Sequence, residues 1–216
     1  MNLDKMVPGG MWAAAALVGA VVVGASYLFG MDAELPNATM LIWKGAGVWL
    51  LAVYAGLCAR TNAGWFIALV MAMGALGDVL VERSLAAGSA AFIVGHIAAT
   101  YLYLSNRRPV LTQSQRWLAI VTVPAVMLIS WSLTQDMGVV FYSLFLSVMA
   151  ASAWISRFPR FWTGIGAMLF VASDLLIFAQ MGPMAESDWI STAIWALYFA
   201  GQVMIVLGVT RTLARE

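Results

Sequence analysis

Two aspartates, Asp78 and Asp174, lie inside apolar segments that are long enough to cross a bilayer. Each has a small residue before it and two aliphatic residues after it. A carboxyl group deep in a bilayer costs about 2.5 to 3.5 kcal/mol on insertion scales, so it needs a partner or a function. Two adjacent buried carboxyl groups share one proton, which places a general acid beside a general base. The sequence therefore predicts an Asp78–Asp174 catalytic pair, with purely structural pairing to Lys44 as the alternative.

Two further charged or titratable side chains are expected near these carboxyl groups. Lys44 lies in an apolar run, where it snorkels outward, pairs with an aspartate or binds a ligand phosphate. His96, the only histidine, is expected on the helix that follows Asp78, either in the site or as an interhelical hydrogen-bonding group. Glu82 shares a helix face with Asp78 but is expected to be a solvated helix end.

Uncharged polar side chains complete the candidate set. Tyr198 and Gln202 are four residues apart, so they share one helix face. They either line the site or hold neighbouring helices together. Tyr142 is expected near the start of its helix, in the same half of the bundle.

Several other chemistries are excluded by the residues themselves. One histidine cannot supply a three-histidine zinc site. The chain has no G-x-S-x-G motif for a serine esterase and no glycine-rich phosphate loop. We therefore expect an activity that uses no metal and no cofactor. The net charge is +1 and no basic patch alternates with aromatic residues, so nucleic acid is not an expected partner.

The candidate residues must be positioned by membrane-spanning helices. The chain of 216 residues is 63% hydrophobic and 10% charged, whereas soluble domains carry about 25% charged residues. Its apolar runs are continuous rather than alternating, which favours helices over a barrel. The first run is too long for a signal-peptide core and is predicted to be a retained helix. We expect an all-α polytopic bundle of eight transmembrane helices, at about Gly10–Phe29, Ala38–Ala59, Ala63–Val81, Ala87–Leu104, Trp117–Leu133, Met137–Ile155, Phe161–Gln180 and Trp189–Val209.

The distribution of positive charge predicts the orientation of this bundle. Cytoplasmic loops gather Lys and Arg. With eight helices, one side of the membrane holds only Arg83, and Lys44 lies in a helix. The other side holds nine basic residues, namely Lys5, Arg60, Arg107, Arg108, Arg116, Arg157, Arg160, Arg211 and Arg215. Both termini are therefore predicted to be cytoplasmic, and the candidate site is predicted to lie in the outer half of the membrane.

The domain organisation predicted is a single membrane domain over residues 1–216. The long loop between the fourth and fifth helices divides it into two candidate four-helix halves, 1–105 and 116–216. Each half carries an aspartate in its third helix, and both of those helices run outward. A parallel internal repeat is one interpretation of this match, which rests on one short motif.

Four motifs of this chain occur in the same order in the YhhN-like family of eight-helix membrane proteins, which the sequence resembles. The motifs are Gly77-Asp78, Gly88-x3-Phe92-x3-His96, Gly166-Ala167-x2-Phe170-x2-Ser173-Asp174 and Tyr198-x3-Gln202. Two positions depart from the family pattern. Gly45 stands where the family usually has a proline after the lysine, and Ala99 stands where it often has a tyrosine, whose role would pass to Tyr101 or Tyr103.

This resemblance implies a lysoplasmalogenase, an enzyme that hydrolyses the vinyl ether of a 1-alkenyl-glycerophosphoethanolamine or -choline. It implies Asp78 and Asp174 as catalytic residues. It also implies a lysophospholipid substrate, contact with membrane lipid and a bacterial inner (plasma) membrane location; no oligomeric state follows from it. The implied substrate-binding residues are Lys44, His96, Tyr142, Ser173, Tyr198 and Gln202.

The alternative function is a proton-coupled transporter in which the same buried charges form a relay. No pair of helices broken by glycine or proline marks a midplane binding site of the kind that such transporters use. The hydrolase is therefore the favoured interpretation.

The charge distribution generates a prediction about orientation. A cysteine introduced between residues 31 and 37 should react with an impermeant thiol reagent added to intact cells, because this acidic loop is predicted to be outside. A cysteine introduced between residues 107 and 115 should react only after lysis. The opposite labelling pattern would reverse the orientation and place the candidate site in the cytoplasmic leaflet.

Overall fold

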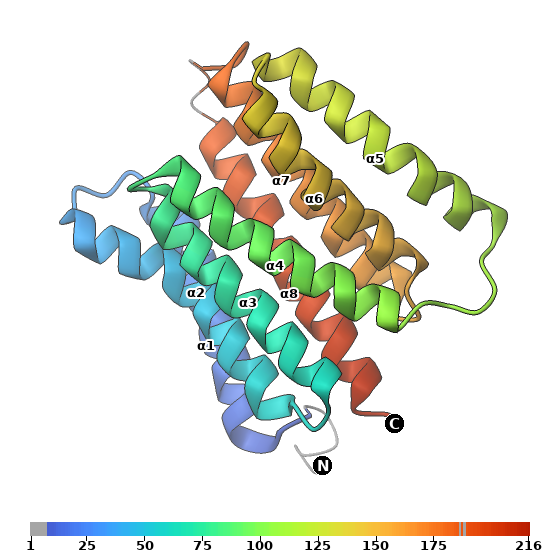
Figure 1. Cartoon of the computed structure of the whole chain (residues 1–216). Coiled ribbons are helices and arrows are strands. Elements are labelled where there is room, and N and C mark those ends of the chain that lie inside the picture. The colour runs from blue at the N-terminus through green and yellow to red at the C-terminus, as the bar shows by residue number, and fades with distance from the viewer. Residues whose placement is uncertain (1–7, 186, 188) are drawn as a thin grey trace. The chain divides into compact units, whose positions relative to one another are not determined.

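The computed structural model describes residues 8–185, 187 and 189–216, and Lys5 lies outside these residues. Eight of the described helices are long and apolar enough to cross a membrane, which confirms the predicted all-α polytopic architecture (Figure 1). Their bounds are α1 Gly10–Gly30, α2 Asn37–Cys58, α3 Asn62–Val81, α4 Leu85–Ser105, α5 Gln113–Thr134, α6 Met137–Ile155, α7 Ile165–Met181 and α8 Ile190–Leu213. The cytoplasmic location of both termini stays a prediction.

Three of the expected helix bounds are displaced by four residues, and one of these is the end of α8, at Leu213 rather than Val209. Helix α5 begins at Gln113 rather than Trp117, because Thr112 and Gln115 form a capping box that extends the helix beyond its apolar run. Helix α7 is preceded by a π-helical turn, η2, over Arg160–Gly164. The η2 turn and α7 together make one segment of membrane-spanning length, Arg160–Met181.

The chain divides into two compact units. The first comprises Met1–Ala99 and Val206–Glu216, and the second comprises Thr100–Ile205. The division falls inside α4 and inside α8, so each of these helices contributes to both units. The predicted single domain over 1–216 with candidate halves 1–105 and 116–216 stays a prediction.

In the first unit, α2 packs against both α1 and α3. Helices α3 and α4 approach closely where they have glycine: a Cβ added at Gly77 would lie 2.7 Å from the Phe92 ring, and one added at Gly88 would lie 2.6 Å from the backbone of Val81. The last turn of α8 joins this unit through a hydrogen bond of 3.1 Å between the hydroxyl groups of Tyr54 and Thr210. Small residues thus bring these helices into close contact.

In the second unit, α5, α6 and α7 pack against one another. Helices α7 and α8 meet at Gly166 and Gly201, where a Cβ on either residue would lie 2.7 Å from the carbonyl oxygen of the other. At one end, Arg108 ties the α4–α5 connection to the α6–α7 connection, because its side chain donates to the carbonyl oxygens of Ser156 (2.7 Å) and Phe158 (3.2 Å).

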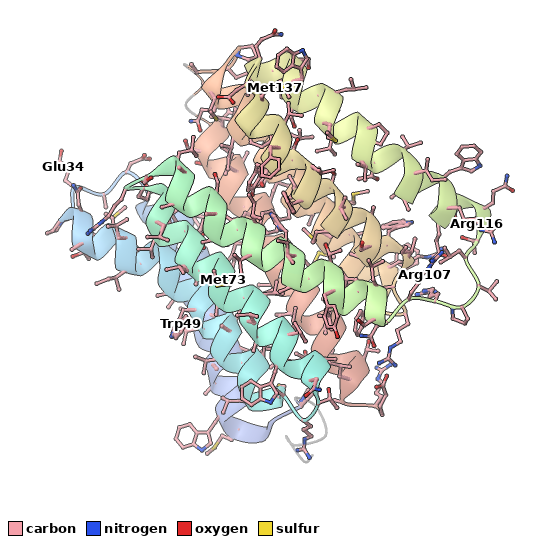
Figure 2. All side chains as sticks on the ribbon, viewed as in Figure 1. Glu34, Trp49, Met73, Arg107, Arg116 and Met137 are labelled. Carbon is pink, nitrogen blue, oxygen red and sulfur yellow. The ribbon has the colours of Figure 1, made fainter. Side chains whose placement is uncertain are left out.

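Two of the arginines of the second unit lie at the same end of it. Arg107 and Arg116 lie at the end of this unit where α4 is joined to α5, whereas Met137 lies at the opposite end, where α6 begins (Figure 2). Large apolar side chains such as Trp117, Ile120 and Leu128 of α5 are exposed. An apolar exterior of this kind is suited to contact with lipid, and it agrees with a multi-pass membrane protein.

Candidate active site

The second unit places Tyr142 and Asp174 in direct contact. The Tyr142 hydroxyl of α6 donates a hydrogen bond of 2.7 Å to Oδ2 of Asp174 on α7. Both residues are buried, at 9% and 4% exposure. The Tyr142 ring also packs edge-to-face on Phe178, one turn after Asp174, with centroids 6.1 Å apart. Tyr142 therefore fixes the orientation of the Asp174 carboxyl group from a neighbouring helix.

Ser173, the residue before Asp174, connects α7 to α8. Its hydroxyl donates to the carbonyl oxygen of Ile194 at 3.0 Å. Bonds of this type hold helices together where no water is available. The contact positions the backbone beside Asp174, so Ser173 acts on the candidate site through the packing of α7 on α8.

Tyr198 and Gln202 lie on α8 and are both buried. The Tyr198 ring packs edge-to-face on Phe170 of α7, with centroids 5.0 Å apart. Gln202 is 1% exposed, and its Oε1 atom has no hydrogen-bond partner among the described residues. A buried acceptor without a partner is costly, so Gln202 Oε1 is a candidate acceptor for a hydrogen bond from a ligand.

In the first unit, Asp78 lies in the last turn of α3 and is 4% exposed. The preceding Gly77 packs directly against the ring of Phe92 on α4. The Phe92 ring in turn stacks on the buried imidazole of His96, with centroids 6.4 Å apart and planes at 21°. The Gly77–Phe92 contact therefore positions the segments of α3 and α4 that carry Asp78 and His96.

Lys44 forms an ion pair with Glu82, a pairing that the sequence did not predict. The Lys44 side chain is 20% exposed and that of Glu82 is 45% exposed, so this pair lies at the edge of the unit rather than in its interior. Ion pairs this exposed contribute little to stability, typically below about 1 kcal/mol. The pair keeps a cation and a carboxylate in place near Asp78, which shares a helix with Glu82.

Tyr27 of α1 is a second residue of this neighbourhood that the sequence did not identify. It is 7% exposed, and it is close enough to Lys44, Glu82 and Asp78 for their charges to act on its hydroxyl group. Its ring packs edge-to-face on Trp43 with centroids 5.8 Å apart. Tyr27 lies in the last turn of α1, and α1 packs on α2, the helix that carries Lys44. This position was the signal from which its nearness to Lys44 could have been predicted.

The eight sequence-predicted residues are thus divided between the two units. Lys44, Asp78 and His96 belong to the first unit. Tyr142, Ser173, Asp174, Tyr198 and Gln202 belong to the second unit. The pairing of Asp78 with Asp174 stays a prediction.

Eight apolar helices, with the carboxyl groups of Asp78 and Asp174 buried among them, define a multi-pass helical membrane protein. The chain belongs to the YhhN family, which it matches over residues 39–209. It is similar to proteins named lysoplasmalogenase from Mycobacterium bovis and Mycobacterium tuberculosis. Each is 27% identical to it over 177 residues, which cover 78% of this chain and 58% of the relative. No solved structure matches the chain.

The contact between Tyr142 and Asp174 generates a prediction about stability. Tyr142→Phe should lower the free energy of unfolding by about 1 to 3 kcal/mol, because a hydrogen bond to a buried carboxyl group is lost. The matched control is Tyr103→Phe, since Tyr103 is also buried but its hydroxyl has no hydrogen-bond partner among the described residues. That variant should be neutral or stabilising. Thermal unfolding in detergent measures both, and equal destabilisation by the two variants would contradict the importance of the bond.

Proposed function

We propose that this chain is a lysoplasmalogenase in a bacterial plasma membrane. It would hydrolyse the vinyl ether of 1-alkenyl-glycerophosphoethanolamine or -choline to a fatty aldehyde and a glycerophospho-amine. The observation that carries the proposal is the similarity to two relatives with this name within a shared family. The matching residues span 58% of the length of those relatives.

The proposed reaction needs an acid and a base but no metal. The vinyl ether accepts a proton at the alkene carbon remote from oxygen, which leaves an oxocarbenium ion. Water adds to the cation and loses a proton, giving a hemiacetal. The hemiacetal then collapses to the aldehyde and the free alcohol of the glycerophospho-amine. One proton is delivered and one is removed, so two carboxyl groups in opposite protonation states are sufficient.

Asp78 and Asp174 are the proposed carboxyl groups. Both are buried, and a buried carboxyl group in a membrane helix is a functional candidate by default. The Tyr142 hydrogen bond supports a functional role for Asp174, because a reacting group must be held in a defined orientation. The proposed substrate-binding residues are Lys44 for the phosphate, and His96, Tyr142, Ser173, Tyr198 and Gln202 for the remainder of the lipid.

The first test of this proposal is aldehyde release by purified protein supplied with lysoplasmenyl-ethanolamine. Asp78→Asn and Asp174→Asn should each reduce turnover by about 100- to 10,000-fold, because general acid–base help is lost while side-chain volume is retained. Asp32→Asn, in the exposed connection after α1, is the matched control and should retain turnover. If both helix variants are folded, inserted and fully active, the catalytic assignment is wrong.

The second test separates two roles for Lys44. If the ammonium group holds the substrate phosphate, Lys44→Met should mainly raise KM, because that contact serves ground and transition states alike. Glu82→Gln keeps the lysine and removes its ion-pair partner, so it should not raise KM. If the ion pair instead tunes the catalytic groups, both variants should lower kcat and shift its pH profile. A Lys44→Met enzyme unchanged in KM, kcat and pH optimum would remove Lys44 from the site.

A further inference from the structure

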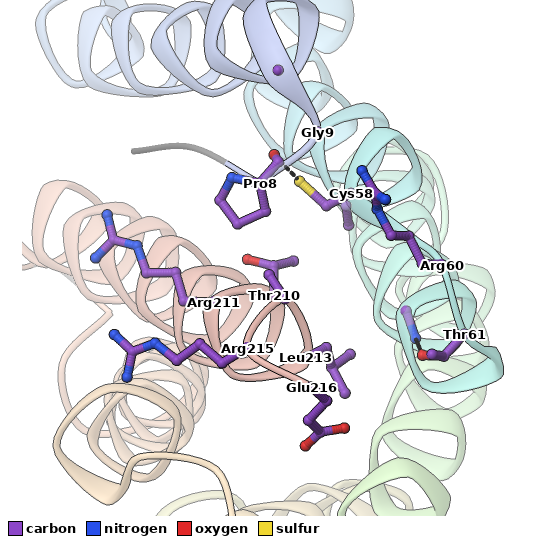
Figure 3. Close-up of a pocket in the computed structure, with 14 residues that line it drawn as sticks. Pro8, Gly9, Cys58, Arg60, Thr61, Thr210, Arg211, Leu213, Arg215 and Glu216 are labelled. Atoms are coloured by element: carbon purple, nitrogen blue, oxygen red, sulfur yellow. Dashed lines mark hydrogen bonds between the residues drawn. The ribbon is translucent and has the colours of Figure 1, made fainter. Parts of the chain in front are cut away.

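A pocket of about 1050 Å³ lies at one end of the first unit, where three segments distant in sequence meet. Its walls come from the residues before α1, from the end of α2 with the α2–α3 connection, and from the last turns of α8. Figure 3 shows Pro8, Cys58, Thr210 and Leu213 between Arg60 on one side and Arg211 with Arg215 on the other. The pocket is separate from the candidate active-site residues of this unit, since Cys58 follows Lys44 on α2 by about 21 Å of helix.

The charged lining of the pocket is mostly basic. Arg60, Arg211 and Arg215 contribute three guanidinium groups, and Glu216 is the one acidic residue in the described lining. All three arginines are exposed at the surface, and Arg60 and Arg215 are the two that we expect to reach a ligand from the membrane interface. Guanidinium groups present paired N–H donors that match the oxygen atoms of a phosphate group. The charge of the lining therefore favours an anion.

The backbone at the start of α1 favours an anion as well. Gly9, the residue before the helix, has φ of +92°, a conformation that favours glycine, and it provides no side-chain cap. The N–H groups in the first turn of a helix lack intrahelical partners and carry partial positive charge. Gly9 and Gly10 both line the pocket, so this helix start adds to the field of the three arginines.

Part of the pocket lining is apolar. Ala55 and Gly64 are buried, and Leu213 and Ala214 contribute further apolar surface. The Cys58 thiol donates to the carbonyl oxygen of Pro8 at 2.7 Å, which fixes the segment before α1 against the end of α2. A lining with both apolar and basic residues suits an amphiphile, with its phosphate at the arginines and its apolar part against the helices.

We propose that this pocket binds the phosphate headgroup of an anionic membrane lipid. The site is independent of the proposed hydrolase activity, because it uses none of the residues assigned to that reaction. It lies at the helix ends where the charge distribution places the cytoplasmic leaflet, and basic pockets between transmembrane helices on that side are suited to anionic lipid headgroups. The bound lipid would join the N-terminal segment, the α2–α3 connection and the end of α8.

The single cysteine of the chain gives a direct test, because Cys58 lines the pocket. The full-length protein in phosphatidylcholine micelles or nanodiscs is titrated with phosphatidylglycerol, and alkylation of Cys58 is followed by mass spectrometry. The alkylation rate should fall about tenfold when the lipid is at about ten times its Kd, since only the unbound fraction reacts. Equal rates with and without phosphatidylglycerol would overturn the proposal.

Variants identify the residues responsible. Arg60→Gln combined with Arg215→Gln should abolish the protection, because two of the three guanidinium groups are lost. Arg116→Gln is the matched control, since it removes an exposed arginine predicted to face the same leaflet but lies outside the pocket. It should retain full protection. Retention of phosphatidylglycerol in native mass spectrometry provides a second measurement that does not depend on the cysteine. Protection unchanged in the double variant would overturn the site.

Soluble ligands distinguish a lipid headgroup from free phosphate. Inorganic phosphate and glycerophosphoglycerol, which lacks acyl chains, are tested at the same concentration as the lipid. We expect phosphatidylglycerol to protect Cys58 strongly and either soluble ligand to protect it weakly, because the apolar part of the lining contributes to lipid binding. If inorganic phosphate protects as well as the lipid does, the pocket is a phosphate site and the lipid assignment is wrong.

Discussion

The hydrogen bond from Tyr142 to Asp174 shows the constraint on which the whole molecule depends: polar groups inside a bilayer must find partners within the protein. Serine and threonine side chains meet this constraint locally. Thr122, Ser130 and Thr210 each donate to the carbonyl oxygen one turn earlier in their own helix. Such bonds need no neighbouring helix. The aspartate is different, because its partner comes from another helix, and its position therefore depends on how α6 and α7 pack.

That packing depends on residues without side-chain bulk. Gly166 and Gly201 allow α7 and α8 to touch through their backbones, and Ser173 donates to α8 nearly two turns further along α7. Gly77 has the equivalent role in the first unit, where it receives the ring of Phe92 immediately before Asp78. In the first unit the glycine contact lies next to Asp78, whereas in the second it lies about 12 Å along α7 from Asp174. Replacement of such a glycine would move the helix that carries the candidate carboxyl group.

The sequence predicted the fold well because membrane helices follow from local composition. Eight continuous apolar runs were sufficient for eight helices, and their bounds were displaced mainly where polar residues extend a helix, as at Gln113. The candidate site was less accessible to prediction. Pairing between Lys44 and Glu82, and the nearness of Tyr27, depend on which faces α1, α2 and α3 present to one another. Apolar runs without strong amphipathic character carry little information about those faces.

The two ends of α2 show how the same membrane constraint allows different functions. Near its start, the Lys44 cation is paired with the carboxylate of Glu82, which directly follows α3, at the edge of the first unit. This pair adds no net charge to that end of the helix. Near its end, Arg60, Arg211 and Arg215 line a pocket whose described lining contains one acidic residue. An excess of positive charge at a membrane interface attracts anionic headgroups, so we propose a lipid site at this end and a substrate site near Lys44.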